Sequence, residues 1–400
     1  MVNFSFDRRA FLRGAVAAGV GGAVTTASAA IPGPAVVAAP AQPFHGMHQA
    51  GIEQAPAPGS QTVFTAYDVT VRTVGELVDL LRALTDRARR LTGAAAPVDV
   101  AAPAPDDGVL GPDPCRSMPT VTVGFGASLF ERFGLAGRRP AALAPMPVFP
   151  NDRLQPAWCH GDLSVQLNAA DLDTCVHALR DLGRATRGGM RPRWRIDGFV
   201  NPPRPDGSPR NLLGFKDGSG NPTRAEFDRL IWTGEDPGPA WTTGGSYLVI
   251  RLIRMLVESW DRLERGGQER ILGRDRDTGA PLDGARESDE PDYTEDPEGV
   301  YTPLNCHIRR ANPRTPDTVD NRILRRAFNY DHGVDEEGDL DQGLVFVCYQ
   351  RDPRRQFEAI QRRLADEPLT SYIRPFGGGY FFVPPGVRDE SDFYGRALVT

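Results

Sequence analysis

The sequence has 400 residues, with 46 Lys plus Arg against 52 Asp plus Glu, so its formal net charge is −6. A hydrophobic content of 40% and a charged content of 24% are typical of a globular protein. The acidic balance and the lack of a Lys/Arg-rich tract exclude a basic nucleic-acid-binding surface, so we expect no nucleic-acid partner. The length exceeds what one hydrophobic core usually holds, which predicts two domains.

The first residues predict an export signal. Arg8 and Arg9 precede a short apolar run rich in Gly and Ala, and Ala27-Ser28-Ala29 resembles a cleavage site. This pattern favours a twin-arginine signal at 1–29 over a membrane span or a chance arginine pair. We therefore expect an exported protein that is periplasmic, cell-wall-associated or extracellular. No other stretch is long and apolar enough to anchor the chain in a membrane.

Residues 30–60 are rich in Pro and Ala and predict an arm that lies on the surface. The arm contains "FHGMHQAG", in which His45, Met47 and His48 offer ligands that suit copper. No second cluster completes such a site, so copper binding is the less favoured interpretation. The five cysteines form no CxxC pair or zinc spacing, and their pairing cannot be deduced from the sequence.

Beyond residue 60, strand and helix patterns alternate. In the first half we expect strands at 61–71, 119–126, 162–169 and 191–200. Helices are expected at 73–92, 128–133 and 171–186, the last with Asp171 as its cap. In the second half we expect strands at 245–255, 343–352 and 377–384, and helices at 257–265 and 353–365.

The two halves resemble each other. "LSVQLNAADLDTCVHAL" aligns without gaps with "LVFVCYQRDPRRQFEAI", which places Leu163 on Leu344. Each half fits a β-α-β-β-α-β unit, so we predict an α+β fold of two fused ferredoxin-like domains, of the dimeric α+β barrel type, from internal duplication. The predicted domains are 61–210 and 211–400. The polar stretch 266–303 is expected to be a solvated insertion rather than an acidic metal site.

One histidine stands beside many arginines. In "NCHIRRANPRTPDTVDNRILRRAF", His307 is followed by Arg309, Arg310, Arg314, Arg322, Arg325 and Arg326. A neutral imidazole is the usual axial ligand of haem iron, and guanidinium groups suit the two haem carboxylates. A structural histidine beside a basic helix would explain this segment alone at least as well.

A second segment decides between these interpretations. "NLLGFKDGSGNP", residues 211–222, places Lys216 and Asp217 among three glycines. "GFKDG", "HIRRANPR" and "LRRAF" together resemble the dye-decolorising peroxidase family. "PFHGMHQAGI", "GRDRDTGAPL", "GLVFVCYQ" and "PFGGGYFFVPPG" look like its exported branch, which includes deferrochelatase-like members. The resemblance covers nearly the whole chain after the signal.

The resemblance implies one haem b per chain, held by the C-terminal half. His307 would be the axial ligand of the iron, Asp217 the distal acid–base residue and Arg325 the distal arginine. Further haem contacts would come from Gly218, Ser219, Gly220, Asn312, Pro313 and Arg314, with Arg309 a less certain carboxylate partner. Ala327 departs from the glycine of many relatives. We expect Lys216, the only lysine, to face solvent or to brace its loop.

The implied reaction is the reduction of hydrogen peroxide. Glycines let the backbone approach a flat cofactor, the Asp217 carboxylate would move a proton between the peroxide oxygens, and Arg325 would stabilise developing negative charge. Because an aspartate ordinarily has a low pKa, we expect an acidic optimum.

Electrons would come from dyes, phenolics or similar donors too bulky for a pocket lined by Leu344 and Phe346. The aromatic residues that could carry these electrons, although core packing explains each better, are Trp232, Trp241, Trp260, Tyr330 and Tyr380. The alternative function is haem or iron handling in an iron-uptake system. A homo-oligomer and iron-uptake partners are further expectations.

Overall fold

The computed structural model describes residues 42–93, 107–111, 118–234 and 238–400. The predicted export signal at 1–29, the first part of the predicted arm and Cys115 lie outside these ranges. The four cysteines within them are free and buried. No helix in the described parts of the chain is long and apolar enough to cross a membrane.

The first half forms an antiparallel sheet with the strand order β2-β3-β1-β4. Its strands are β1 (Gln61–Val69), β2 (Thr120–Gly126), β3 (Leu163–Ala169) and β4 (Met190–Phe199). Its helices are α1 (Val74–Leu91), α2 (Ala127–Arg132) and α3 (Leu172–Ala185). Helix α1 begins with a capping box, in which Thr73 and Glu76 satisfy each other's backbone N–H groups.

The second half repeats this strand order as β7-β8-β5-β9. Its strands are β5 (Ser246–Met255), β7 (Phe328–Val334), β8 (Leu340–Gln350) and β9 (Ile373–Val383), and the short β6 (Leu324–Arg325) pairs with the end of β8. Its helices are α4 (Phe227–Leu230), α5 (Val257–Trp260), α6 (Arg265–Leu272), α7 (His307–Ala311), α8 (Phe357–Arg363) and α9 (Arg396–Val399). The predicted α+β fold of two ferredoxin-like units is confirmed.

The halves join edge to edge into one barrel. Strand β2 pairs with β9 through Phe125 and Phe382, and β4 pairs with β7 through Phe199 and Asn329. All strands except β6 thus form a closed antiparallel ring. Because side chains alternate along each strand, every second residue points inward, and one apolar cluster fills the barrel from both halves. Its members include Phe64, Trp194, Ile250, Val347 and Phe381.

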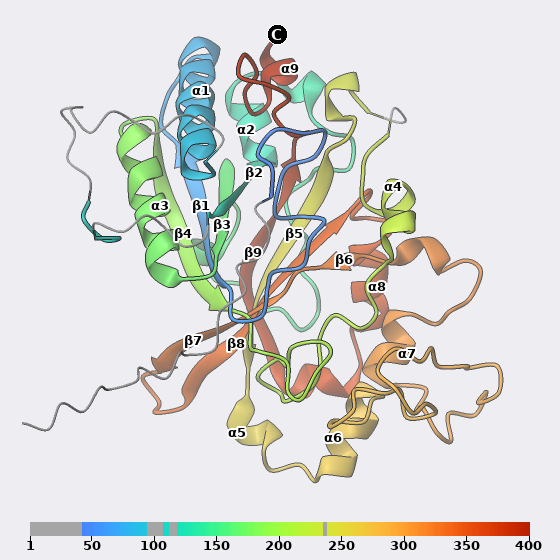
Figure 1. The fold of residues 1–400 in the computed structure, drawn as a ribbon. Coiled ribbons are helices and arrows are strands. Elements are labelled where there is room, and N and C mark those ends of the chain that lie inside the picture. The colour runs from blue at the N-terminus through green and yellow to red at the C-terminus, as the bar shows by residue number, and fades with distance from the viewer. Residues whose placement is uncertain (1–41, 94–106, 112–117, 235–237) are drawn as a thin grey trace, which may run out of the picture. The chain divides into compact units, whose positions relative to one another are not determined.

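The outer faces of the two halves are covered differently. Helices α1 and α3 lie side by side over the first half, and their buried leucines, such as Leu81 and Leu182, pack in one cluster with Val63 and Val165 (Figure 1). In the second half, the shorter helices α6, α7 and α8 gather beside the strands (Figure 1). These helices and the strands border a cavity.

Four local predictions need correction. The described part of the arm does not merely lie on the surface, because Phe44 and Ile52 are buried and Gln49 Nε2 donates to Val123 O and Pro384 O at 3.0 Å each. Asp171 stands at the N-cap of α3 but makes no side-chain cap bond. The helix expected at 257–265 is divided into α5 and α6. The helix expected at 353–365 is shorter and spans only Phe357–Arg363, as α8.

A buried ion pair anchors the loop that precedes the short 3-10 helix Pro156–Trp158 to β5. Arg251 and Asp152 are paired with side chains 1% and 0% exposed, and Arg251 Nη1 lies 3.2 Å from Asp152 Oδ2. Removing one partner leaves an uncompensated buried charge.

We therefore expect Asp152→Ala to lower the free energy of unfolding by about 3–5 kcal/mol, measured by urea denaturation of the apoprotein. The double variant Arg251→Met/Asp152→Leu should regain most of that loss, because apolar groups can replace a buried pair. A single variant as stable as the wild type would contradict this assignment.

Candidate functional site

Residues 211–222 form a tight turn that presents Asp217. Asn211 Oδ1 accepts from the backbone N–H groups of Leu213 and Phe215 at 3.1 and 3.3 Å. Gly214 and Gly218 have φ values of +87° and +117°, which strain any residue with a side chain. The Asp217 N–H donates to Pro209 O at 2.9 Å. The sequence therefore fixes the backbone on both sides of the carboxylate.

Asp217 faces Arg325. Asp217 Oδ1 lies 3.4 Å from Arg325 Nη1, and both side chains are partly buried. Asn221 holds the Arg325 backbone at both ends, accepting from its N–H at 2.9 Å and donating to its carbonyl at 3.1 Å. Asn221 thus holds the 211–222 turn next to β6. Sequence reasoning missed this role, since nothing in the single sequence pairs Asn221 with a strand about a hundred residues away.

His307 begins α7 and is held by a buried carboxylate. Its Nδ1 lies 2.8 Å from Glu367 Oε2 and 3.1 Å from Oε1. Burial alone would lower the pKa of His307, but the charge of Glu367 and the hydrogen bond to it raise that pKa. With Nδ1 occupied, Nε2 is the nitrogen left for another partner. Sequence reasoning did not identify Glu367, which lies in an unremarkable "ADEPL" segment.

The structure brings His307, Asp217 and Arg325 to one cavity, which we call the His307 cavity. The rest of its wall is largely apolar. Its apolar residues include Phe215, Ile253, Leu272, Leu344, Phe346 and Ile360. Leu344 and Phe346 therefore line the pocket, as expected.

The polar stretch 266–303 is not merely a solvated insertion, because it supplies Arg274 and Tyr293 to this wall. Arg274 Nη1 donates to Gly279 O at 2.5 Å and to Glu287 O at 3.2 Å, and it has no carboxylate partner among the described residues. Burial, reinforced by the charges of Arg325 and Arg314, lowers its pKa. A partly buried cation without a carboxylate partner is suited to bind a carboxylate ligand.

The other predicted contacts divide into three groups. Ser219, Gly220, Asn312 and Arg314 line the His307 cavity, whereas Gly218 lines an adjacent chamber and Pro313 lines neither. Arg314 pairs with Glu290 at 2.7 Å.

The prediction for Arg309 needs correction. Its guanidinium donates to Thr302 O at 2.9 Å and to Asp296 O at 2.8 Å, so it is engaged away from the cavity that it was expected to line.

These residues fit haem. An imidazole with a free Nε2 suits the iron, an apolar wall suits the ring, and an unpaired arginine suits a carboxylate of the ring. The guanidinium of Arg274, which has no carboxylate partner among the described residues, is the observation that favours this group over a purely apolar ligand.

A smaller chamber of mixed lining adjoins the cavity, and Asn211, Asp217, Arg325 and Leu344 line both. The chamber also contains Asn329, whose Nδ2 donates to Arg210 O at 3.1 Å. Asn329 Oδ1 is buried and has no hydrogen-bond partner in the described structure.

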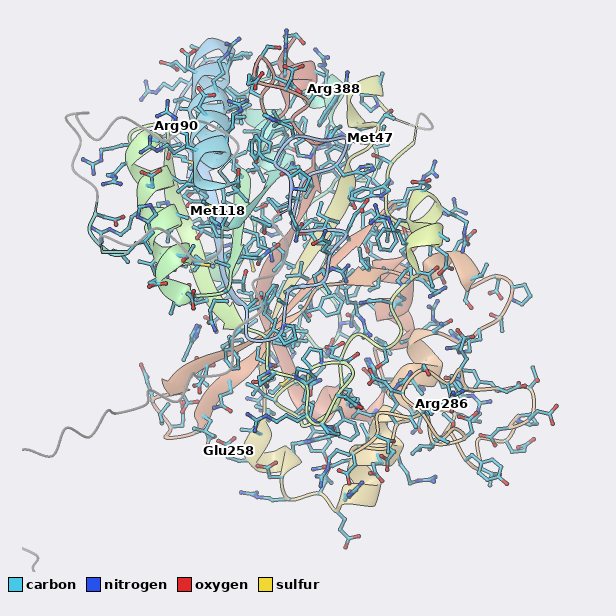
Figure 2. All side chains as sticks on the ribbon, viewed as in Figure 1. Met47, Arg90, Met118, Glu258, Arg286 and Arg388 are labelled. Atoms are coloured by element: carbon cyan, nitrogen blue, oxygen red, sulfur yellow. The ribbon has the colours of Figure 1, made fainter. Side chains whose placement is uncertain are left out.

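The copper ligands suggested by the sequence already have other roles. His48 stacks on Trp232 with ring centroids 3.7 Å apart and bonds Gly244 O at 2.7 Å, while His45 Nε2 accepts from Arg89 at 3.2 Å. Met47 is exposed (Figure 2). The described residues contain no cluster of three or more His, Cys, Asp or Glu placed to bind a metal ion.

The five aromatic candidates for electron transfer are all buried, with exposed fractions of 7% or less. Core packing is therefore their evident role. Tyr380 alone combines a buried hydroxyl without a partner in the described structure and an edge contact, at 6.1 Å between ring centroids, with the cavity residue Phe357.

Comparisons with known proteins agree with this geometry. Family models match both halves: Dyp-type peroxidase, N-terminal, over residues 49–200, and Dyp-type peroxidase, C-terminal, over 208–388. A deferrochelatase of Escherichia coli is 45% identical over 373 residues, covering 90% of this chain and 87% of that protein. A deferrochelatase of Yersinia pseudotuberculosis is 44% identical over 372 residues, covering 90% and 85%.

Solved structures are similar over the same span. The DyP-type peroxidase from Cellulomonas bogoriensis has a TM-score of 0.80 and 38% identity, and the match covers 90% of this chain and 98% of that one. Ferric DtpA from Streptomyces lividans has a TM-score of 0.80 and 38% identity, with coverages of 90% and 96%. Since these likenesses extend through both halves, the chain belongs to the Dyp-type peroxidases, a family of haem enzymes that act on peroxide.

Proposed function

We propose that this chain is an exported haem b peroxidase that reduces hydrogen peroxide with Asp217 and Arg325 and oxidises dyes, phenolics or similar one-electron donors. The observation that carries the proposal is one shared cavity. The Asp217–Arg325 pair and the His307–Glu367 pair both line it. Export rests on the twin-arginine pattern at 1–29.

Each residue has a role toward the cofactor. His307 would hold the iron through Nε2, with Glu367 fixing the ring through Nδ1. Arg274 and Arg314 would pair with the haem carboxylates, and Ser219, Gly220 and Asn312 would line the ring. When bound, haem supplies an iron that exchanges electrons with peroxide and with donors.

Asp217 moves the proton. Its carboxylate accepts a proton from one peroxide oxygen and returns it to the other, which then departs as water. The positive charge of Arg325, 3.4 Å from Asp217, stabilises negative charge on the departing oxygen.

A second function also has a specific observation in its favour. The relatives from Escherichia coli and Yersinia pseudotuberculosis, at 45% and 44% identity, are named deferrochelatase. On this alternative the chain handles haem or iron as cargo, with iron-uptake partners, and its peroxidase activity is incidental.

The first test changes the proton carrier. We expect Asp217→Asn to slow the reaction with hydrogen peroxide by about 10²–10⁴-fold, because an amide cannot accept the proton. Stopped-flow absorbance after one equivalent of peroxide measures this rate. The Soret band of the resting protein should not change.

An Asp217→Asn variant that reacts as fast as the wild type would contradict the role of Asp217. A wild-type Soret band that ignores peroxide would favour haem or iron carriage instead.

The second test concerns the iron ligand. We expect His307→Ala to lose the Soret band, and Glu367→Gln to weaken haem binding by about 10–100-fold, because a partner of the ligand orients it and raises its basicity. Titration of the apoprotein with haem measures both. The exposed Glu390→Gln serves as a control and should bind as the wild type does. Unchanged haem binding in His307→Ala would rule out His307 as the ligand.

The third test is the pH profile. We expect the peroxide reaction to be fastest in acid, because the aspartic acid must give its proton back. Steady-state rates across the pH range measure this, and a maximum at or above about pH 8 would argue against Asp217 as the proton carrier.

A further inference from the structure

Lys216 is the only lysine in the chain, and the structure buries it. Its side chain is 3% exposed, so it does not face solvent. Nζ lies 2.9 Å from Glu287 Oε2 and 3.7 Å from Asp206 Oδ1. The carboxylate of Glu287 compensates the charge of the buried ammonium, because burying that charge unpaired would cost much free energy.

Glu287 comes from the 266–303 stretch and binds the 206–220 segment at three points. It accepts from Lys216 Nζ at 2.9 Å, from Ser219 Oγ at 2.8 Å and from the Ser208 N–H at 3.2 Å. Lys216 and Ser219 stand on either side of Asp217 in the chain. One carboxylate therefore fastens both flanks of Asp217.

The slot around this pair explains why the residue is lysine in a chain whose other basic residues are arginine. A Cβ at Gly207 would lie 2.1 Å from Glu287 Oε2, and a Cβ at Gly279 would lie 2.7 Å from Lys216 Cδ. Both glycines have positive φ, +74° and +78°. An unbranched chain with a compact head fits between them, whereas the wide planar guanidinium of arginine does not.

The Asp217 carboxylate itself has little else to hold it. Arg325, at 3.4 Å, is its single charged partner among the described residues. Its place therefore depends on its backbone, which is tied by the bond to Pro209 O and by the contacts of Lys216 and Ser219.

We propose that Glu287 and Lys216 are positioning residues that hold Asp217 in place beside Arg325 for the peroxide reaction. This inference rests on the proposed function and adds to it Glu287, which does not line the His307 cavity, and Lys216, whose nearly buried side chain lies at the cavity wall. Proton transfer depends steeply on the placement of the carrier, and a misplacement of about 1 Å can cost about 10²-fold in rate.

Moderately acidic pH does not break the contacts of Glu287 with Lys216, Ser219 and Ser208. Burial would raise the pKa of Glu287, but the hydrogen bonds from Ser208, Lys216 and Ser219 outweigh it and lower the pKa to about 2. The stabilisation is thus fully present above the ordinary glutamate pKa of about 4.3 and is lost only as the pH falls toward 2.

The test compares Lys216→Met, Lys216→Arg and Glu287→Gln with the wild type. We expect the rate constant for peroxide to fall by about 10–100-fold in Lys216→Met and Glu287→Gln, and we expect haem occupancy and the KM for the donor to be unchanged in Glu287→Gln, which lies outside the cavity wall. Lys216→Arg should not restore the rate, since the slot excludes the guanidinium. Ser219→Ala, which removes a single bond, is the milder variant if the others fold poorly.

Deuterium uptake by peptides covering 206–221 of the apoprotein gives a readout that needs no activity. It should rise in Lys216→Met and Glu287→Gln. Two controls remove a charge from the same stretch without touching the segment. They are Glu295→Gln, which is exposed, and Arg286→Gln, which is exposed and lies in the connection between α6 and α7 (Figure 2). Both should match the wild type in uptake and rate.

Two results would overturn the inference. Unchanged uptake in both variants would show that the pair does not hold the segment, and raised uptake with a peroxide rate within about twofold of the wild type would show that holding it does not position Asp217. Failure of the proposed function looks different, because then the wild type and Asp217→Asn would both be inert toward peroxide.

Discussion

Strand β8 is the constraint on which the rest of the second half depends. One edge pairs with β5 along its length, and the other edge pairs with β7 at one end and β6 at the other. Its alternate residues therefore face two environments: Val345 and Val347 enter the barrel, while Leu344 and Phe346 face the cavity. Through the pairing of Arg325 with Cys348, the same strand fixes the backbone position of Arg325.

Duplication explains why a cavity lies in the second half. In the first half, α1 and α3 have 18 and 14 residues, and their leucines fill the outer face of the sheet. In the second half the comparable face meets α8, of 7 residues, and the short α7. Shorter helices bury less of the sheet, and the remaining space is the His307 cavity. One architecture thus serves as a packed core in one copy and as a binding site in the other.

The sequence predicted the strands and helices that carry strong periodicity, and the internal alignment predicted the repeated strand order. It also placed Asp217, Arg325 and His307 in one site, through the resemblance of their motifs. The sequence did not identify Glu367, Asn221 or Arg274. Glu367 and Asn221 matter through contacts across 60 to about 100 residues of chain, and Arg274 matters because it has no carboxylate partner among the described residues. No local pattern encodes such contacts.

The errors have the same physical origin. The 266–303 stretch has the composition of a solvated loop, yet Arg274 and Tyr293 turn inward, and sequence alone does not distinguish a charged residue at the surface from one that faces a cavity. Arg309 belongs to the same run of arginines as Arg314. Its guanidinium, however, donates to Thr302 O and Asp296 O, and Arg309 does not line the cavity.

The 266–303 stretch contacts both the cavity and the segment that carries Asp217. Arg274 lines the cavity, and Glu287 accepts a hydrogen bond from Lys216, the neighbour of Asp217. A ligand that binds Arg274 and stabilises this conformation of the stretch would therefore also stabilise the contacts of Glu287 with the 206–220 segment. Substitutions within residues 266–303 would then change the order of the segment that carries Asp217 while the residues that line the cavity stay the same.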